Sequence, residues 1–354
     1  MGAPLASTRL RTQSVLRLTL AWSVVGLVTA LFEHAALLAH GVPSTWEARI
    51  DERFLPTLLA GLFGGGAYFF LVRRRLRGMA FLPAFGLMAA LVLAVVAVTG
   101  ALWPALRNAG PWWDNFAGRF FSLAFLAQYL YWALLMGATM LIMRSNDQYG
   151  GRGMAYLTGR YHKPRQEMRV FMFLDMRSST AIAERLGHVK YFQLLNSLFT
   201  DITDPIINAR GGIYQYVGDE ISVSWPLRRG ISRHRCVRCF LDIRAKMRRR
   251  APYYRQRFGI EPVFKAGLHY GPITTGEVGV LKRERIYSGD VVNTTARIQE
   301  SCNEHGVDNL ISQDLLDVLN LPPDKFAVRE IGSIALQGKS RPTRLWTIEQ
   351  GPGH

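Results

Sequence analysis

Four long apolar stretches fill the first part of the chain, and each is long enough to cross a lipid bilayer. They run from about Val15 to Leu38, Phe54 to Val72, Met79 to Trp103 and Phe120 to Met143. A membrane-spanning helix needs ~20 apolar residues, and helices satisfy all of their backbone hydrogen bonds internally. We therefore predict an all-α four-helix transmembrane domain over residues 1–143.

The connections between these stretches differ in charge. Arginines are concentrated before the first stretch, at 73–77 between the second and third, and at 144–165 after the fourth. The other two connections, 44–53 and 106–119, carry mixed charge or little charge. Because cytoplasmic connections are enriched in arginine and lysine, we predict four spans in the plasma (inner) membrane, with both termini cytoplasmic. A cleaved signal peptide is the alternative for the first stretch, but its length and the three further stretches favour a span.

The chain is strongly basic, with a formal net charge of +17 over 354 residues. Such a charge is compatible with nucleic acid, but here the arginines lie beside apolar segments, where membrane topology explains them. We therefore predict membrane lipid, and no nucleic acid, as a partner. The three cysteines lie in the second half and are too few for a disulfide framework, which favours a reducing cytoplasm.

Two groups of residues with ligand chemistry favour structural roles. Glu33 and His34 fall inside the first apolar stretch, where ionisable side chains are costly, but no other stretch offers a histidine to complete a ligand site. Cys236 and Cys239 lie about one helical turn apart with only His234 nearby, so we favour packing over a metal site.

A polar and basic segment separates the two halves. Residues 144–167 contain Gly150, Gly151 and Gly153 and lack a sustained heptad pattern, so we do not expect a long coiled coil. Pro164 marks its end, since the residue before a proline avoids the helix. We therefore predict a cytoplasmic linker over 144–167 and a second domain over 168–354.

The second domain opens with two candidate acidic sites. The apolar strand Val170–Leu174 ends at Asp175, and Ser178, Ser179 and Thr180 follow where a helix begins, so backbone N–H groups there are placed to face an anion. Further on, Gly218 and Asp219 form the tip of a predicted hairpin. Two strand-end carboxylates are suited to Mg²⁺ or Mn²⁺ holding a nucleoside triphosphate, whereas the alternative is two solvated turn aspartates.

The order of elements predicts the fold class. Strand, helix, hairpin, helix and strand in succession indicate an α+β domain with a ferredoxin-like βαββαβ core. The expected helices are 181–186, which ends at Gly187, then 188–209, 232–258, one opened by 288–297, and 314–319. The expected strands are 170–174, 213–217, 221–225, 265–271, 310–312, 326–331 and 344–348.

Asn293 and Arg297 are four residues apart and share one face of their helix. With Asp175 and the Gly218–Asp219 hairpin in the same order, they make the chain from about Arg169 to Trp346 resemble the class III nucleotidyl cyclases. This resemblance implies attack of the ribose 3′-oxygen on the α-phosphorus of a nucleoside triphosphate, with pyrophosphate leaving. It also implies a homodimer in which each active site combines the aspartates of one subunit with the Asn–Arg helix of the other.

The resemblance assigns roles to further residues. Asp175 and Asp219, with the backbone carbonyl of Met176, would hold two Mg²⁺ or Mn²⁺ ions per active site. Asn293 would orient the ribose and Arg297 would stabilise charge on the α-phosphate, a task suited to the fixed donors of a guanidinium. In the family, a lysine at the position of Lys339 reaches the phosphates of the nucleotide.

The expected base-recognition positions depart from the family pattern. Gln215 stands where members that make cyclic AMP carry a lysine, and Ile286 stands where they carry aspartate or threonine. An isoleucine accepts no hydrogen bond, whereas Gln215 is able to bond either purine, so Lys265 or Lys282 is a candidate replacement. We predict a membrane-bound adenylate cyclase acting on ATP.

Three alternatives stay open at this point. A guanylate or pyrimidine nucleotide cyclase is compatible with the altered base pocket, and a catalytically silent nucleotide-binding membrane regulator is compatible with the fold. A diguanylate cyclase has a similar hairpin, but this chain lacks the second glycine of that motif and has the Asn293–Arg297 helix.

Overall fold

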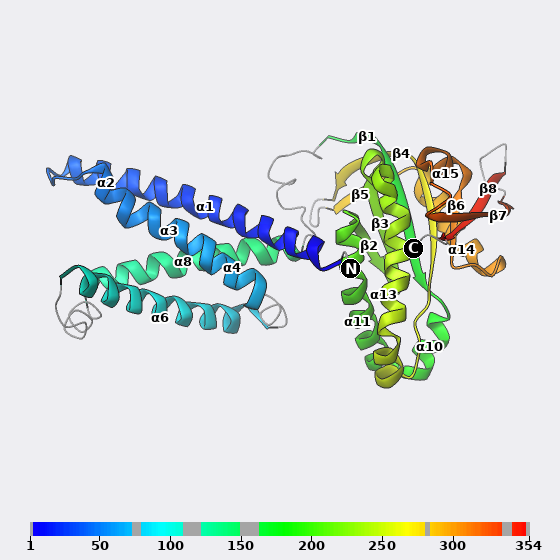
Figure 1. Ribbon diagram of the computed structural model, residues 1–354, viewed down its shortest axis with the longest axis horizontal. Coiled ribbons are helices and arrows are strands. Elements are labelled where there is room, and N and C mark those ends of the chain that lie inside the picture. The colour runs from blue at the N-terminus through cyan, green and yellow to red at the C-terminus, as the bar shows by residue number, and fades with distance from the viewer. Residues whose placement is uncertain are drawn as a thin grey trace. The chain divides into compact units, whose positions relative to one another are not determined.

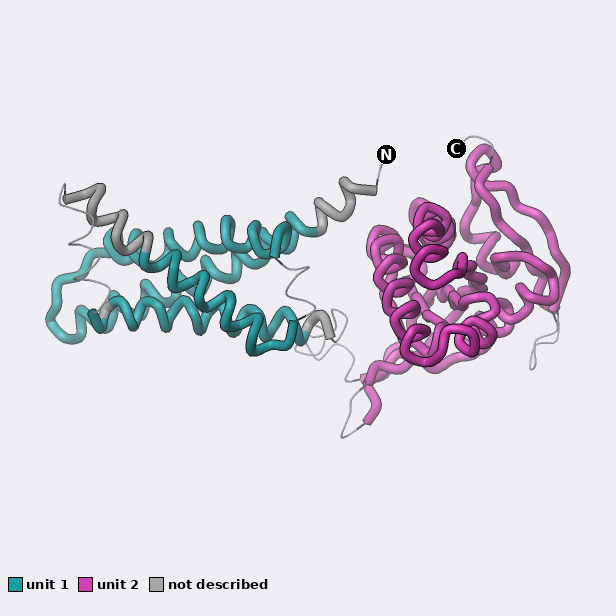
Figure 2. Tube along the Cα trace, turned by 90° about the horizontal axis from the view of Figure 1, so that it is seen from below, with its two compact units in different colours: residues 1–149 teal, residues 150–354 magenta. Residues whose placement is uncertain are grey.

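The structure is a computed structural model that divides into two compact units (Figure 2), Met1–Tyr149 and Gly150–His354. It describes residues 3–72, 79–108, 122–148, 163–279, 284–334 and 342–351.

The described part of the first unit is largely helical (Figure 1). It contains α1 (Ala3–Ala39), a continuous helix from Trp46 to Val72, α6 (Phe81–Asn108) and α8 (Leu123–Gln148). In the second of these helices, α-helical turns alternate with wider π-helical turns. Its segments are α2 (Trp46–Arg49), η1 (Ile50–Phe54), α3 (Leu55–Leu59), η2 (Ala60–Gly64), α4 (Gly65–Ala67) and η3 (Tyr68–Val72).

Apolar helices dominate this unit, as the sequence predicts. Within the described residues, three segments are long and apolar enough to cross a membrane, and Phe81–Ala97 is a shorter apolar segment of α6. The three are Arg11–Ala39, Trp46–Val72 and Phe125–Ser145. Four spans and their orientation therefore remain predictions, and the connection 109–121 lies outside the described residues.

Glu33 and His34 have partners inside this helical unit. Arg53 donates to both carboxylate oxygens of Glu33, at 2.6 and 2.8 Å. His34 Nδ1 lies 3.0 Å from the hydroxyl of Ser44, and its ring stacks on Trp46 with the ring centroids 4.7 Å apart. These contacts tie α1 to the helix that follows it and confirm the structural interpretation of this pair.

The second unit is built on one mixed sheet of eight described strands. The strand order is β2-β3-β1-β4-β6-β8-β7, and β5 pairs with the far end of β4. The pair β4–β6 is parallel and the other pairs are antiparallel. The strands are β1 (Arg165–Met176), β2 (Gly212–Val217), β3 (Glu220–Pro226), β4 (Phe264–Val278), β5 (Glu284–Ser288), β6 (Asn309–Ser312), β7 (Phe326–Ile334) and β8 (Thr343–Gln350).

Helices cover both faces of this sheet. They are α10 (Ser179–Leu186), α11 (His188–Asn208), α12 (Leu227–Ile231), η4 (Ser232–His234), α13 (Arg235–Phe258), α14 (Asp290–Glu304) and α15 (Gln313–Leu319). The helices α11 and α13 lie side by side (Figure 1) and pack on one face through the largest apolar cluster. Helix α14 packs on the other face, against β1 and β4. The first four strands thus have the predicted ferredoxin-like order.

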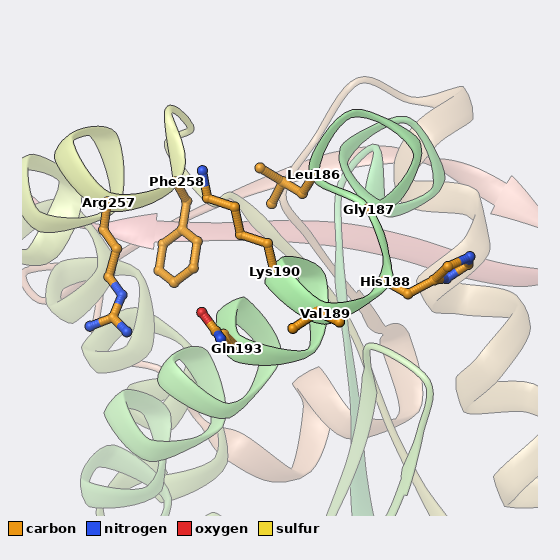
Figure 3. A pocket seen from close by; sticks show the side chains of 8 residues that line it. All are labelled: Leu186, Gly187, His188, Val189, Lys190, Gln193, Arg257 and Phe258. Atoms are coloured by element: carbon orange, nitrogen blue, oxygen red, sulfur yellow. The ribbon is translucent and has the colours of Figure 1, made fainter.

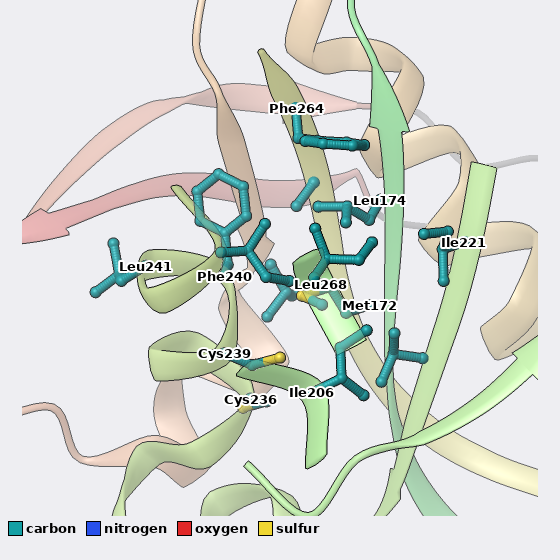
Figure 4. Close-up of a cluster of buried hydrophobic side chains, with 14 of the residues drawn as sticks. Met172, Leu174, Ile206, Ile221, Cys236, Cys239, Phe240, Leu241, Phe264 and Leu268 are labelled. Atoms are coloured by element: carbon teal, nitrogen blue, oxygen red, sulfur yellow. The ribbon is translucent and has the colours of Figure 1, made fainter. Parts of the chain in front are cut away.

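Successive side chains of β1 point to opposite faces of the sheet. Met172 and Leu174 point into the cluster under α11 and α13, whereas Phe171 and Phe173 join the smaller cluster under α14. Figure 4 shows Met172 and Leu174 in the larger cluster, together with Cys236 and other labelled members. Cys236 and Cys239 are fully buried there as free thiols, which confirms that they pack in the core.

Several predicted boundaries were wrong, including those of the strand expected over 170–174, which runs from Arg165 to Met176. The strand that was expected to end at Gly271 continues to Val278, because β5 takes over from β6 as the partner of β4 beyond Pro272. A proline is tolerated where the neighbouring strand changes. Helix α13 begins at Arg235 and not at Ser232, since Arg233 and His234 both have a φ of 56° and interrupt the helix.

Candidate active site

Asp175 lies near the end of β1, on the face covered by α14. Its carboxylate oxygen Oδ2 accepts a hydrogen bond from Gln299 Nε2 at 3.2 Å and lies 3.2 Å from the ammonium group of Lys265. Lys265 stands directly opposite Asp175 in the β1–β4 pairing. The sheet register therefore brings a cation beside this carboxylate.

The two partners of Asp175 are themselves buried. Lys265 is 7% exposed and Gln299 is 3% exposed. Gln299 reaches the sheet because α14 approaches β4 at Gly267, where an added Cβ would lie only 2.7 Å from the Cα of Gln299. A glycine at this position sets how close the helix sits, and thereby places Gln299 within reach of Asp175.

Asp219 lies at the tip of the β2–β3 hairpin. Val217 pairs with Glu220, so Gly218 and Asp219 form a two-residue turn, and Gly218 takes a φ of 60°. The predicted hairpin is confirmed. The oxygen Oδ2 of Asp219 is buried and has no hydrogen-bond partner among the described residues, a costly arrangement for a carboxylate oxygen.

The electrostatics around Asp219 favour a cation. Burial and the neighbouring carboxyl group of Asp175 raise the pKa of Asp219, although the hydroxyl of Ser179 partly offsets this. Burial and the charge of Asp175 also raise the pKa of Glu220, the next residue. Carboxylates that are crowded in this way gain stability from a bound positive ion.

The residues present fit a divalent metal ion. Among the described residues, no group of three or more His, Cys, Asp or Glu side chains forms a closed ligand set. Mg²⁺ is commonly held by one or two carboxylates, with water and substrate phosphates completing its shell. Asp175 and the unpaired oxygen of Asp219 supply that number of protein ligands. The backbone of Met176, at the end of β1, was predicted to add a carbonyl oxygen.

Arg177 fixes the chain immediately after these residues. Its backbone N–H donates to Val263 at 2.8 Å, and its guanidinium group donates to Asp308 and Asn303, both at 3.2 Å. This attachment holds the turn between β1 and α10. Sequence reasoning did not identify Arg177 as a positioning residue, because the partners of its guanidinium group are about 130 residues away in the chain.

The predicted phosphate-binding residues open α10. Ser178 precedes the helix with a φ of 57°, and no side-chain hydrogen bond caps the helix there. Ser178 and Thr180 are exposed, whereas Ser179 is partly buried. Tyr191 on α11 belongs to the same region, since burial and the charge of Asp219 raise the pKa of its phenol group.

The predicted transition-state residues lie on α14. Asn293 is exposed and Arg297 is partly buried, but the α14 side chain that is hydrogen-bonded to Asp175 is Gln299. Gln299 was missed by the sequence analysis. It had a signal, because a polar residue there lies on the sheet-facing stripe that includes Ile298 and Cys302.

The predicted base-recognition residues are dispersed over three strands. Gln215 is exposed on β2, opposite Ser222, and Ile286 is 38% exposed on β5. The described contact of Lys265 is with Asp175, so a direct contact with the base stays a prediction. Lys282 and Lys339 lie outside the described residues.

A cavity of about 480 Å³ lies apart from the predicted site residues. Figure 3 shows it at the junction of α10 and α11, where Lys190, Gln193 and Arg257 lie around Phe258. Its remaining lining residues are Leu186, Gly187, His188 and Val189. None of the predicted catalytic, metal-binding or substrate-binding side chains that the structure describes lines it.

Comparison with known proteins identifies the second unit. The family described as the adenylate and guanylate cyclase catalytic domain matches residues 161–350. Adenylate cyclase 2 of Rhizobium meliloti is 37% identical over 198 residues, covering 56% of this chain and 54% of that protein. Retinal guanylyl cyclase 2 of Rattus norvegicus is 26% identical over 182 residues, covering 50% of this chain and 16% of that protein.

A solved structure supports the same fold. A bacterial light-regulated adenylyl cyclase superposes with a TM-score of 0.53 at 18% identity, covering 62% of this chain and 65% of that one. The chain spans about half the length of the Rhizobium relative and less of the rat relative. Because the family matches more than half of the chain, the chain belongs to the family of adenylate and guanylate cyclase catalytic domains.

Proposed function

We propose that this protein is an adenylate cyclase, which converts ATP to 3′,5′-cyclic AMP and pyrophosphate with two divalent cations held by Asp175 and Asp219. The observation that carries this proposal is the buried oxygen Oδ2 of Asp219, which lies near the charge of Asp175 and has no hydrogen-bond partner in the part of the chain that the structure describes. A fold that keeps such an oxygen unsatisfied lowers its own stability, which is typical of ligand sites.

The side chains of this protein would position the substrate and balance its charge. Arg297 would donate hydrogen bonds to the α-phosphate as negative charge develops there, and Asn293 would orient the ribose. Lys265 would hold the Asp175 carboxylate in place through the ion pair that the fold provides. When bound, Mg²⁺ or Mn²⁺ would lower the pKa of the attacking hydroxyl and neutralise the triphosphate.

We further propose that the active site forms between two copies of the chain. Gln299, and not Asn293 or Arg297, occupies the α14 position that is hydrogen-bonded to Asp175 within one chain. Exposed Asn293 is therefore available to a second copy, as expected if each site combines two subunits. One catalytic unit per chain would give two equivalent sites in a symmetric dimer.

ATP is proposed as the substrate on the basis of the relatives of this chain. The relative with the higher identity is an adenylate cyclase, which favours ATP, whereas a guanylyl cyclase also matches. Gln215 and Ile286 favour guanine or a pyrimidine as a second candidate, because neither supplies the side chain expected for adenine.

Product analysis tests this proposal directly. Purified full-length protein is incubated with Mn²⁺ and each of ATP, GTP, CTP and UTP, and the products are identified by mass spectrometry. Cyclic AMP from ATP alone is the expected result. Cyclic GMP as the main product would show that the reaction is as proposed but that GTP is the substrate. The absence of a product from any of the four nucleotides would contradict the enzymatic function.

We also propose that the helical unit anchors the enzyme through four spans in the inner membrane, with both termini in the cytoplasm. The length of α6, 28 residues, supports the fourth span. Within the chain, we assign 1–143 to the membrane domain, 144–167 to the linker and 168–354 to the catalytic domain. A reporter enzyme that is active only outside the cytoplasm should be active when fused after residue 41 and inactive when fused after residue 148.

A further inference from the structure

Four arginines converge where α11, α12 and α13 meet the end of the sheet. Arg210 follows α11, Arg229 lies in α12, Arg233 lies in η4 and Arg235 begins α13. We call these four residues the arginine cluster. Arg229, Arg233 and Arg235 lie within seven consecutive residues, whereas Arg210 comes from a separate part of the chain, so tertiary packing brings its charge near Arg235.

Trp225 anchors the segments that carry the cluster. A Cβ added at Gly211 would lie 2.9 Å from the Trp225 ring, and one added at Gly230 would lie 3.1 Å from its Cβ. The indole N–H donates to the carbonyl of Ala209 at 3.0 Å. Each of these glycines directly follows a cluster arginine, so packing on Trp225 sets the positions of both Arg210 and Arg229.

The cluster holds like charges together. Within the described part of the chain, no ion pair with an acid is formed by any of its four members, and Arg235 donates to the backbone carbonyl of Arg229 at 3.3 Å. Burial and the charges of Arg210, Arg233 and Arg229 lower the pKa of Arg235. The folded protein therefore bears a repulsion that an anionic ligand would relieve.

The backbone at the cluster is also unfavourable. Arg210 and Arg233 both have a φ of 56°, in the left-handed region that glycine adopts freely and arginine does not. Such residues persist only where surrounding structure enforces them, and they concentrate at functional sites. The conformation of Arg210 closes α11, because its N–H and that of Gly211 donate to the carbonyls of Ile207 and Ile206, both at 2.9 Å. The charge of the cluster and the conformation of Arg233 are the two observations that support a ligand-binding role for this surface.

Strand register places the cluster at the end of the sheet where β1 begins. Trp225 pairs with Val170, and Pro226 pairs with Arg169, close to where β1 begins at Arg165. Asp175 lies six residues beyond Arg169, or ~20 Å along the strand. The cluster is therefore remote from the carboxylates and close to the point where the chain arrives from the helical unit.

We propose that the arginine cluster binds the anionic lipid headgroups of the membrane that holds the helical unit. This inference rests on the proposed membrane anchorage. The sequence between Gln148 and Lys163 is 14 residues long, so even fully extended it spans no more than ~50 Å. A tether of that length keeps the local concentration of headgroups high, which favours lipid over a freely diffusing polyanion such as RNA.

A fluorescent label at the cluster tests this docking in the full-length protein. Ser232 is exposed between Arg229 and Arg235, and the three native cysteines are buried, so Ser232→Cys allows specific labelling. The protein is placed in nanodiscs of phosphatidylcholine, with or without phosphatidylglycerol, that contain a lipid with a quencher on its headgroup. We expect quenching of the label only in the discs that contain phosphatidylglycerol.

Matched charge variants assign the effect to the cluster. At about fivefold in binding for each arginine near an anionic surface, Arg229→Gln/Arg233→Gln should reduce the docked-to-free ratio about 30-fold. Arg248→Gln/Arg249→Gln removes the same charge from exposed positions ~20 Å along α13 from Arg235, beyond the screening length, and should leave quenching nearly unchanged. The variant Arg229→Lys/Arg233→Lys, which keeps both charges, should retain most of the quenching.

The outcomes separate docking from anchorage. Protein that enters the discs but is not quenched would overturn the docking alone, whereas failure to enter the discs would overturn the anchorage and the docking with it. Equal loss in the two Gln variants would show that net charge, and not the cluster, is responsible. If a short RNA binds at the label in neutral discs and the label does not respond to phosphatidylglycerol, the ligand of the arginine cluster is nucleic acid and not lipid.

Discussion

Asp219→Asn should stabilise the metal-free protein while abolishing turnover. No described residue donates a hydrogen bond to the buried Oδ2 of Asp219, and leaving a buried polar group unsatisfied costs about 1–3 kcal/mol. Because the residue is only partly buried, solvent screening reduces the expected gain to about 1 kcal/mol. An amide keeps the shape of the side chain, removes its charge and offers an N–H group to the neighbouring Asp175.

Hydrogen exchange in the presence of EDTA measures this gain. A change of about 1 kcal/mol should slow the exchange of the buried β1 amides about fivefold, because these amides exchange through global opening of the domain. Glu184→Gln removes a charge from an exposed position of α10 and serves as the control, with no expected change. Unchanged or faster β1 exchange in Asp219→Asn would refute the reasoning.

The dependence on pH follows from the raised pKa of Asp219. At a pH above the raised pKa, the carboxyl group is ionised and its full destabilisation of the folded protein is present. At a pH below the ordinary value of 3.8, the group is protonated in both the folded and unfolded states and this destabilisation is absent. The advantage of Asp219→Asn should therefore be complete at neutral pH and shrink as pH falls through the raised pKa toward 3.8. An advantage that grows on acidification would contradict this sign.

Saturating Mn²⁺ should reverse the order of stability. At a concentration 100 times its dissociation constant, a ligand that binds only the folded state adds about 2.7 kcal/mol. The wild type should gain this stabilisation and Asp219→Asn should gain little of it, so the variant becomes the less stable protein. Equal stabilisation of both proteins by Mn²⁺ would show that Asp219 does not hold the ion.

Three further predictions concern the dimer, the titration of His234 and the packing of α14 on the sheet. Chains with Asp175→Ala and chains with Arg297→Ala should each be inactive and should regain activity when mixed, in a cyclic nucleotide assay; a folded, dimeric mixture without activity would exclude a shared site. Burial and the charge of Arg238 lower the pKa of His234 in the folded protein. The free energy of unfolding should therefore fall as pH drops from 6.5 toward that lower pKa. Urea titrations should show a smaller fall in His234→Asn than in the wild type. Gly267→Ala should displace α14 and reduce turnover at least tenfold, with a cost of about 1–3 kcal/mol, whereas Gly212→Ala, which meets only ordinary contacts, should not.

The strands and helices that carry the carboxylates could be predicted because their apolar periodicity is local. Val170–Leu174 is continuously apolar, and Gly218 marks a hairpin turn, so both acidic positions fall on recognisable elements. In contrast, β5 has charged or polar residues at most of its positions, and it forms a strand only because the extended end of β4 is there to pair with it. Edge pairing of this kind leaves little trace in the sequence.

Contacts within the site were less predictable than the elements that carry them. Lys265 faces Asp175 because of the register between β1 and β4, and no local pattern specifies that register. Gln299 approaches the same carboxylate only because Gly267 lets α14 come close. Both contacts depend on distances across the fold, whereas periodicity and spacing report only on neighbours along the chain.

Asp175 and Asp219 must hold divalent cations together if the proposed reaction is to take place. A crystal structure of the full-length protein with Mn²⁺ and a non-hydrolysable ATP analogue tests this directly, since anomalous scattering locates manganese independently of the refined atoms. We predict manganese peaks coordinated by the carboxylates of both residues and by the phosphates of the analogue. A bound analogue with no manganese at either carboxylate would contradict the account.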